Sequence, residues 1–105
     1  MSLFENVYRA AREFPKEALH GIASQIRRAA VSVPANIAEG AARKTTAELI
    51  QFMYIANGSL SELDTHLELA GRLGYVQDSE LLQQQLDDVQ SQLLTVISSL
   101  KRRSR

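Results

Sequence analysis

Apolar residues recur every three or four positions along nearly the whole chain, and this spacing constrains the fold more than any other feature. Such a step keeps side chains on one face of an α-helix. No segment shows the alternation of a β-strand, and no Asn-Gly or Asp-Gly hairpin turn appears. The pattern therefore predicts an all-α protein. Its clearest part is a seam with the heptad spacing of packed helices: Leu82, Leu86, Val89, Leu93, Val96 and Leu100.

Proline and glycine residues divide this pattern into four helical segments. Pro15 ends the first segment, because proline lacks a backbone N–H and disfavours a helical residue before it. Gly40 is a natural terminator of the second segment through the left-handed conformation, and Gly74 ends the third. Gly21 lies early in the second segment, and the sequence leaves open whether it breaks that helix.

Capping residues mark where the last two helices begin. Thr45 and Glu48 have the spacing of a capping box, and Asp78 is a favourable N-cap for the fourth helix. Four amphipathic helices with short connections predict a single domain over residues 1–105, an antiparallel up-down-up-down four-helix bundle. The core should contain one apolar stripe from each earlier helix: Leu3, Val7, Ala11, Phe14; Leu19, Ile22, Ile26, Ala29, Val33, Ile37; and Leu49, Phe52, Ala56, Leu60, Leu63, Leu67, Ala70, Leu73.

Small and polar residues interrupt the apolar stripes of the second and third helices. Gly58 and Ser59 stand in mid-helix, where glycine costs about 1 kcal/mol relative to alanine, so they suggest close approach of another backbone. Asn36 and Glu39 lie in an apolar context, and we expect them to be buried in a fixed hydrogen-bonded network. Their expected partners are the backbone that Pro34 leaves free, or neighbouring residues: Asn57, Ser59 or Arg28.

Several classes of site find no support in the sequence. The absence of cysteine excludes disulfides, thiolate nucleophiles and cysteine-based zinc sites. Glu17 and His20 match half of a di-metal motif, but Leu63 occupies the acidic position before His66, so we expect no metal site. A catalytic Glu39 is the alternative, although no nucleophile or second acid lies at a useful spacing. We therefore expect no enzymatic activity, no cofactor and no small-molecule substrate.

Neither a membrane partner nor secretion is expected. No run approaches the ~20 apolar residues that span a bilayer, and no signal peptide opens the chain. We therefore expect a cytoplasmic protein.

The formal net charge is zero, but the charges are unevenly distributed. Residues 1–44 carry seven Lys/Arg and four Asp/Glu, a net of +3; residues 45–100 carry one Arg and eight acids, a net of −7; the tail adds +4. Opposite patches can attract each other within one chain or between copies. The candidate phosphate contacts are the basic residues Arg27, Arg28, Arg43, Lys44, Lys101, Arg102 and Arg103. The first four could instead form salt bridges to the acidic helices, and the last three could simply be a solvated helix end.

One stretch is more specific than any periodicity. Residues 25–40 read Gln-Ile-Arg-Arg-Ala-Ala-Val-Ser-Val-Pro-Ala-Asn-Ile-Ala-Glu-Gly. This stretch resembles the signature of the four-helix-bundle family named for the 23S rRNA intervening-sequence protein. The resemblance continues through residues 55–60 and covers about residues 7–100. It identifies these structural signature residues: Pro34, Asn36, Glu39, Gly40, Gly58 and Ser59.

The resemblance carries implications for assembly and function. Family members look like short up-down-up-down bundles, known examples are homopentameric rings with a central channel, and no enzymatic activity belongs to the family. The resemblance thus implies a non-enzymatic homo-oligomer, with a pentamer as the expected form. The alternative is an RNA- or DNA-binding accessory protein, because the family is similar to the strongly basic accessory protein of diversity-generating retroelements.

The chain departs from the family pattern in two ways. It starts inside the first helix, without the preceding apolar stretch and its tryptophan, and its net charge is zero. A short first helix leaves part of the bundle's flank uncovered, which a neighbouring subunit could fill.

Overall fold

Four α-helices follow one another in the computed structural model, which describes the backbone of residues 2–103 and the side chains of residues 3–103. They are α1 (Ser2–Arg12), α2 (Ile22–Ala41), α3 (Thr46–Arg72) and α4 (Ser79–Arg103). A short 3-10 turn, η1 (Lys16–Ala18), precedes α2. No strand occurs within residues 2–103. The prediction of an all-α protein with four helices is therefore confirmed.

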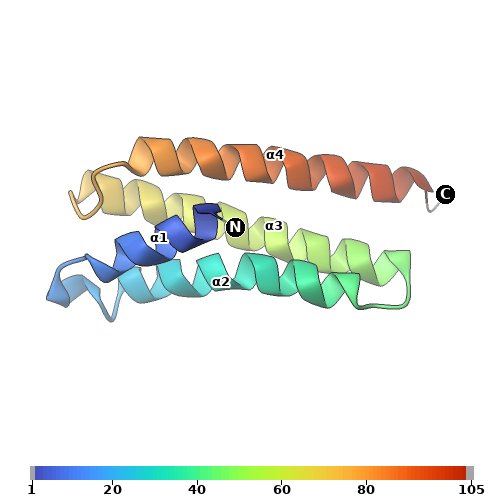
Figure 1. Cartoon of the computed structure of the whole chain (residues 1–105), viewed down its shortest axis with the longest axis horizontal. Helices are drawn as coiled ribbons and strands as arrows, with labels where there is room; N and C mark the ends of the chain where they lie inside the picture. Colours follow the sequence, from blue (N-terminus) through green and yellow to red (C-terminus); the bar gives the residue numbers. More distant parts are fainter. Residues whose placement is uncertain (1, 104–105) are drawn as a thin grey trace.

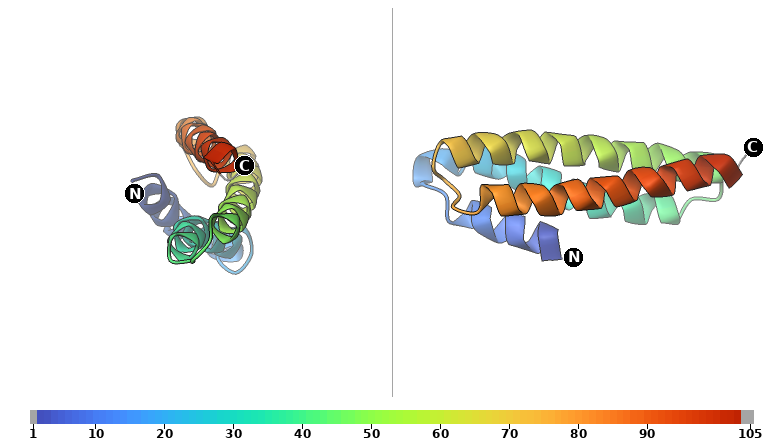
Figure 2. Two further views of the ribbon diagram at one scale, coloured as in Figure 1. Left: turned by 90° about the vertical axis from the view of Figure 1, so that its right-hand side faces the viewer. Right: turned by 90° about the horizontal axis from the view of Figure 1, so that it is seen from above.

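The helices pack side by side in a bundle of 48 × 22 × 19 Å. Their connections lie at alternating ends, so consecutive helices run in opposite directions (Figure 1). Seen end-on, they follow the order α1, α2, α3, α4 around the bundle (Figure 2), and α1 also contacts α4. Because α1 has 11 residues and α3 has 27, four helices stand side by side at one end only.

One apolar core connects all four helices. Its fully buried side chains include Val7, Ile26, Leu60, Leu63 and Leu86. No polar or charged residue among those described is buried. Burial of apolar surface is therefore the main force that holds these amphipathic helices together.

The core departs from the predicted seam near the end of α4. Val96 is 46% exposed, whereas Ile97 is buried. An α-helix drifts by about 20° per heptad relative to a strict seven-residue repeat. By the third heptad the inward position has moved on by one residue, so the assignment of Val96 to the core is wrong.

The ends of α3 follow the predicted signals. Thr45 Oγ1 accepts a hydrogen bond from the Glu48 backbone N–H at 3.1 Å and donates one to Glu48 Oε1 at 2.9 Å. At the other end Gly74 adopts φ +77°, and the Tyr75 N–H bonds to the Ala70 carbonyl at 2.9 Å. Glycine suits this left-handed position because it carries no Cβ.

Gly40 has a different role from the predicted left-handed terminator. Helix α2 continues through it to Ala41, and its φ is not positive. A Cβ added at Gly40 would lie 2.8 Å from Phe52 Cβ and 3.1 Å from Leu49 Cδ1. Gly40 is therefore a point where α2 and α3 approach closely. Gly21, whose role the sequence leaves open, ends the non-helical link directly before α2.

Gly58, in contrast, does not mark a close approach within the chain. It is exposed, and a Cβ added there would meet nothing within 4 Å. The predicted close backbone contact at Gly58 is therefore wrong for the described part of this chain.

These two glycines give a matched pair of variants. Gly58→Ala should stabilise the fold by up to about 1 kcal/mol, because alanine favours the helix and its methyl group has room. Gly40→Ala should destabilise it by about 1–3 kcal/mol, because neither Phe52 Cβ nor the helix backbone can move aside. Urea unfolding followed by circular dichroism measures both changes, and equal signs would contradict the close α2–α3 approach.

Candidate nucleic-acid and assembly surfaces

The signature residue Asn36 links α2 to α3 through a short polar chain. Its Nδ2 donates hydrogen bonds to the Ser32 carbonyl at 2.7 Å and to Ser32 Oγ at 3.0 Å. Ser32 Oγ in turn lies 2.8 Å from Ser59 Oγ of α3. The expected network thus exists and includes Ser59, but Asn36 is half-buried and bonds to Ser32 instead of the carbonyl that Pro34 leaves free.

Glu39 does not belong to this polar network. It is exposed and forms an ion pair with Arg43 one helical turn later. The Arg43 guanidinium also lies over the Phe52 ring, 4.9 Å from its centroid. The expectation of a buried Glu39 is therefore wrong, because residue 39 falls on the outward side of α2, where arginine and water solvate the carboxylate.

The candidate phosphate-binding residues separate into two groups. Arg27 is half-buried and Arg28 exposed, and both lie in the first half of α2. Arg43 follows Arg27 by 16 residues, which is roughly 24 Å along a helix. The structure therefore does not bring Arg27 and Arg28 together with Arg43 and Lys44.

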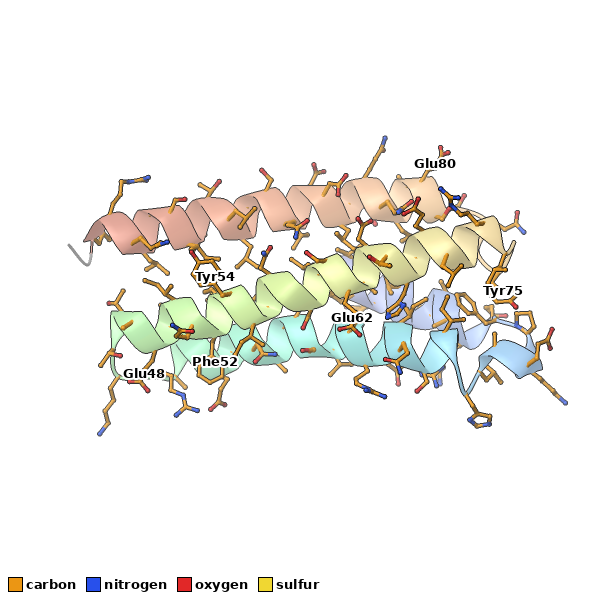
Figure 3. The ribbon with its side chains drawn as sticks, turned by 180° about the vertical axis from the view of Figure 1, so that it is seen from behind. Glu48, Phe52, Tyr54, Glu62, Tyr75 and Glu80 are labelled. Carbon is orange, nitrogen blue, oxygen red and sulfur yellow. The ribbon has the colours of Figure 1, made fainter. Side chains whose placement is uncertain are left out.

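The second group forms a basic end, defined here as Arg43, Lys44, Lys101, Arg102 and Arg103. The α2–α3 connection and the end of α4 lie at the same end of the bundle (Figure 1). Lys101 Nζ donates a hydrogen bond to Tyr54 Oη at 2.9 Å and lies 5.4 Å from the centroid of that ring. Glu48 also lies at this end (Figure 3), and Glu39 is paired with Arg43 there, so these five cations and two acids give a net of +3.

The acids of α3 all have partners, whereas several charged side chains of α1, α2 and α4 have none among the described side chains. Each acid of α3 has a partner: Glu48 with Thr45, Glu62 with His66, Asp64 with Gln83 and Glu68 with Arg72. Three arginines of α1 and α2 and three acids of α4 form no ion pair or hydrogen bond with any other described side chain: Arg12, Arg27, Arg28, Glu80, Asp87 and Asp88. The sequence pattern of charges does not distinguish these six from the rest.

The surface also carries many apolar side chains that the bundle does not cover. Nine large ones are exposed, on all four helices or directly after them: Tyr8, Val31, Tyr54, Ile55, Leu69, Leu73, Leu81, Leu94 and Val96. Exposed apolar residues scattered singly are ordinary, whereas those that lie side by side, such as Tyr8 and Val31 in one groove, mark a contact surface.

Two hollows lie beside the short helix α1. One of about 360 Å³ lies between α1, the α3–α4 connection and α4, and its lining includes Tyr75, Leu81 and Gln85. Gln85 Oε1 is buried and has no hydrogen-bond partner. The other is an almost wholly apolar groove of about 230 Å³ between α1 and α2. The sequence predicts neither hollow, because each lining combines residues from elements that only tertiary packing brings together.

The remaining features concern metals and membranes. Within the described residues no three His, Asp or Glu side chains gather as metal ligands would. Glu17 and His20 are both exposed, near η1. No described helix combines the length and apolar character that crossing a membrane requires.

The four packed helices and the Asn36–Ser32–Ser59 link define a small four-helix-bundle protein. The family model of the 23S rRNA-intervening sequence protein matches residues 1–95 of the chain. Because this match spans most of the chain, the protein belongs to that family, as the signature at residues 25–40 predicted. None of the curated proteins compared with the chain matches it.

The two polar signature residues should respond differently to substitution. Asn36→Ala should destabilise the fold by about 1 kcal/mol, because it removes two half-buried hydrogen bonds. Glu39→Gln should change stability by less than about 0.5 kcal/mol, because an exposed ion pair contributes little. Chemical unfolding of both variants checks this, and a larger loss in Glu39→Gln than in Asn36→Ala would contradict the assigned roles.

Proposed function

We propose that this protein is a non-enzymatic bundle whose function is to assemble with copies of itself into a homo-oligomeric ring. The observation that carries the proposal is the surface: exposed apolar side chains accompany unpaired arginines on α1 and α2 and unpaired acids on α4. Apolar patches and complementary charges on one surface are the usual basis of protein association.

The unpaired cations belong to α1 and α2 and the unpaired acids to α4, so the cations of one copy can contact the acids of the next. Such a heterologous contact repeats from copy to copy and generates a ring when the rotation closes. The number five comes from the family resemblance and is part of the proposal.

The exposure of Glu39 supports the non-enzymatic part of the proposal. This carboxylate is the best catalytic candidate of the sequence, and its exposed pairing with Arg43 leaves it without an enclosed site. Catalytic carboxylates are usually held in clefts, where burial and specific neighbours tune them.

Light scattering coupled to gel filtration tests self-association directly. A pentamer of the 11.7 kDa chain should elute with a mass of about 58 kDa at tens of micromolar protein. A single species of 11.7 kDa over that whole concentration range would contradict the proposal.

The basic end favours a second function, binding of RNA or DNA. Lys44, Arg102 and Arg103 are exposed there and have no acidic partner among the described residues. Cations grouped at one end of a rod can contact several phosphates of one strand, and phosphate contacts of this kind weaken steeply with salt. Arg27 and Arg28 lie too far along α2 to join the same contact.

Fluorescence anisotropy with a labelled single-stranded RNA and its DNA counterpart tests this second function. The variant K44A/R102A/R103A should bind more weakly, and its log K should depend less steeply on log salt, by about 0.7 for each phosphate that the variant no longer neutralises. The variant R9A/K16A/R72A removes the same charge away from the basic end and is the matched control. Equal losses in both variants, or no binding at low salt, would contradict a site at the basic end.

A further inference from the structure

The groove between α1 and α2 is a distinct apolar surface on this small protein. Phe4, Glu5 and Tyr8 of α1 line it together with Ala30, Val31 and Pro34 of α2. Tyr8 is 39% exposed and Val31 55% exposed, so the groove opens to the outside of the bundle. A surface of this kind gains free energy when an apolar side chain enters it and releases water.

Unpaired arginines flank one end of this groove. Arg12 follows Tyr8 by four residues, and Arg27 precedes Val31 by four, so each lies one helical turn from the groove. Because α1 and α2 run in opposite directions, both arginines lie toward the same end (Figure 1). Arg28 adds a further exposed cation beside Arg27. The occupant of the groove should therefore be apolar with an adjacent negative charge.

The outer side of α4 has this composition. Residues 80, 87 and 94 follow a seven-residue spacing in one row along α4, and residues 81 and 88 follow it in a second row about 100° away. Both rows lie away from the buried Leu82 and Leu86, and Leu81 also lines the hollow beside α1. We call this surface the α4 ridge, and Glu80 of the ridge points away from the bundle (Figure 3). Leu81 is 55% and Leu94 43% exposed. The ridge consists of Glu80, Leu81, Asp87, Asp88 and Leu94.

The leucine-to-aspartate spacing on the ridge is about 4 Å longer than the Arg27–Val31 spacing beside the groove. Leu81 stands seven residues before Asp88, and Leu94 seven residues after Asp87, each about 10 Å along the helix. Arg27 stands about 6 Å along α2 from Val31. When either leucine occupies the groove, the long arginine side chain can span the remaining distance to an aspartate. The outer face of α3 also exposes Ile55 and Leu69, but every acid of α3 already has a partner within the chain.

We propose that the α4 ridge of one copy docks into the α1–α2 groove of the next copy, with Asp87 and Asp88 facing Arg27 and Arg28. This inference rests on the self-association proposed above and names the two surfaces that produce it. Each copy uses its ridge on one side and its groove on the other. The same contact therefore accounts for the unpaired charges of α1, α2 and α4 together.

Charge reversal tests this contact. Arg27→Glu with Arg28→Glu makes the groove edge acidic, and Asp87→Arg with Asp88→Arg makes the ridge basic. Each double variant alone should associate at least about tenfold more weakly, because like charges then face each other. One chain carrying all four substitutions should recover association, because every contact again joins opposite charges. An equimolar mixture of the two double variants should recover association only in part, because a ring of five cannot alternate two kinds of copy at every contact.

Two controls keep the result interpretable. Glu62→Arg with Glu68→Arg makes on α3 the same charge change as the ridge variant makes on α4. This control should leave association unchanged. Circular dichroism and thermal melting show whether each variant keeps its fold, and light scattering with sedimentation velocity measures the assembly. A monomeric parent protein would contradict the proposed self-association itself. An oligomeric parent whose reversals have no effect, or whose combined reversal does not recover, would contradict this interface alone.

Discussion

The close contact between α2 and α3 is the constraint on which the rest of the structure depends. It is the most extensive contact between helices, and α1 and α4 each attach to one side of it. Gly40 lets the two backbones approach at Phe52, and the Ser32–Ser59 hydrogen bond links them further along. Small residues allow close packing and a hydrogen bond requires one relative position, so together they fix how α2 and α3 are aligned.

The short first helix shapes the surface of the bundle. Helix α1 covers only one end of the α2–α3 pair, and it leaves a groove on its α2 side and a hollow on its α4 side. The unpaired arginines of α1 and α2 and the unpaired acids of α4 form no ion pairs with one another within one chain. Both proposals for assembly depend on these unpaired charges, since a second copy can supply the opposite charge that each of them lacks within one chain.

The parts of the fold that depend on local chemistry are predictable from the sequence. The capping box at Thr45, the left-handed glycine at Gly74 and the apolar stripes of α1 and of α3 as far as Ala70 each act over one or a few helical turns. The assignment of Leu73 to the core is wrong, because it follows the end of α3 and is 52% exposed. The other errors concern residues whose role depends on a neighbouring helix. Gly40 is a close contact and no terminator, Gly58 meets no other backbone, and Glu39 is exposed, because the orientation of α2 relative to α3 decides each of these.

The sequence by itself therefore determined that the chain is a bundle of four helices, because side-chain periodicity and capping act within a single helix. It also determined the family, through the signature around Asn36. The tertiary structure alone decided which charges remain unpaired, where the basic end lies and that α1 and α2 enclose an apolar groove. The physical reason is that these properties depend on distances between helices, and such distances are set by packing of the whole core.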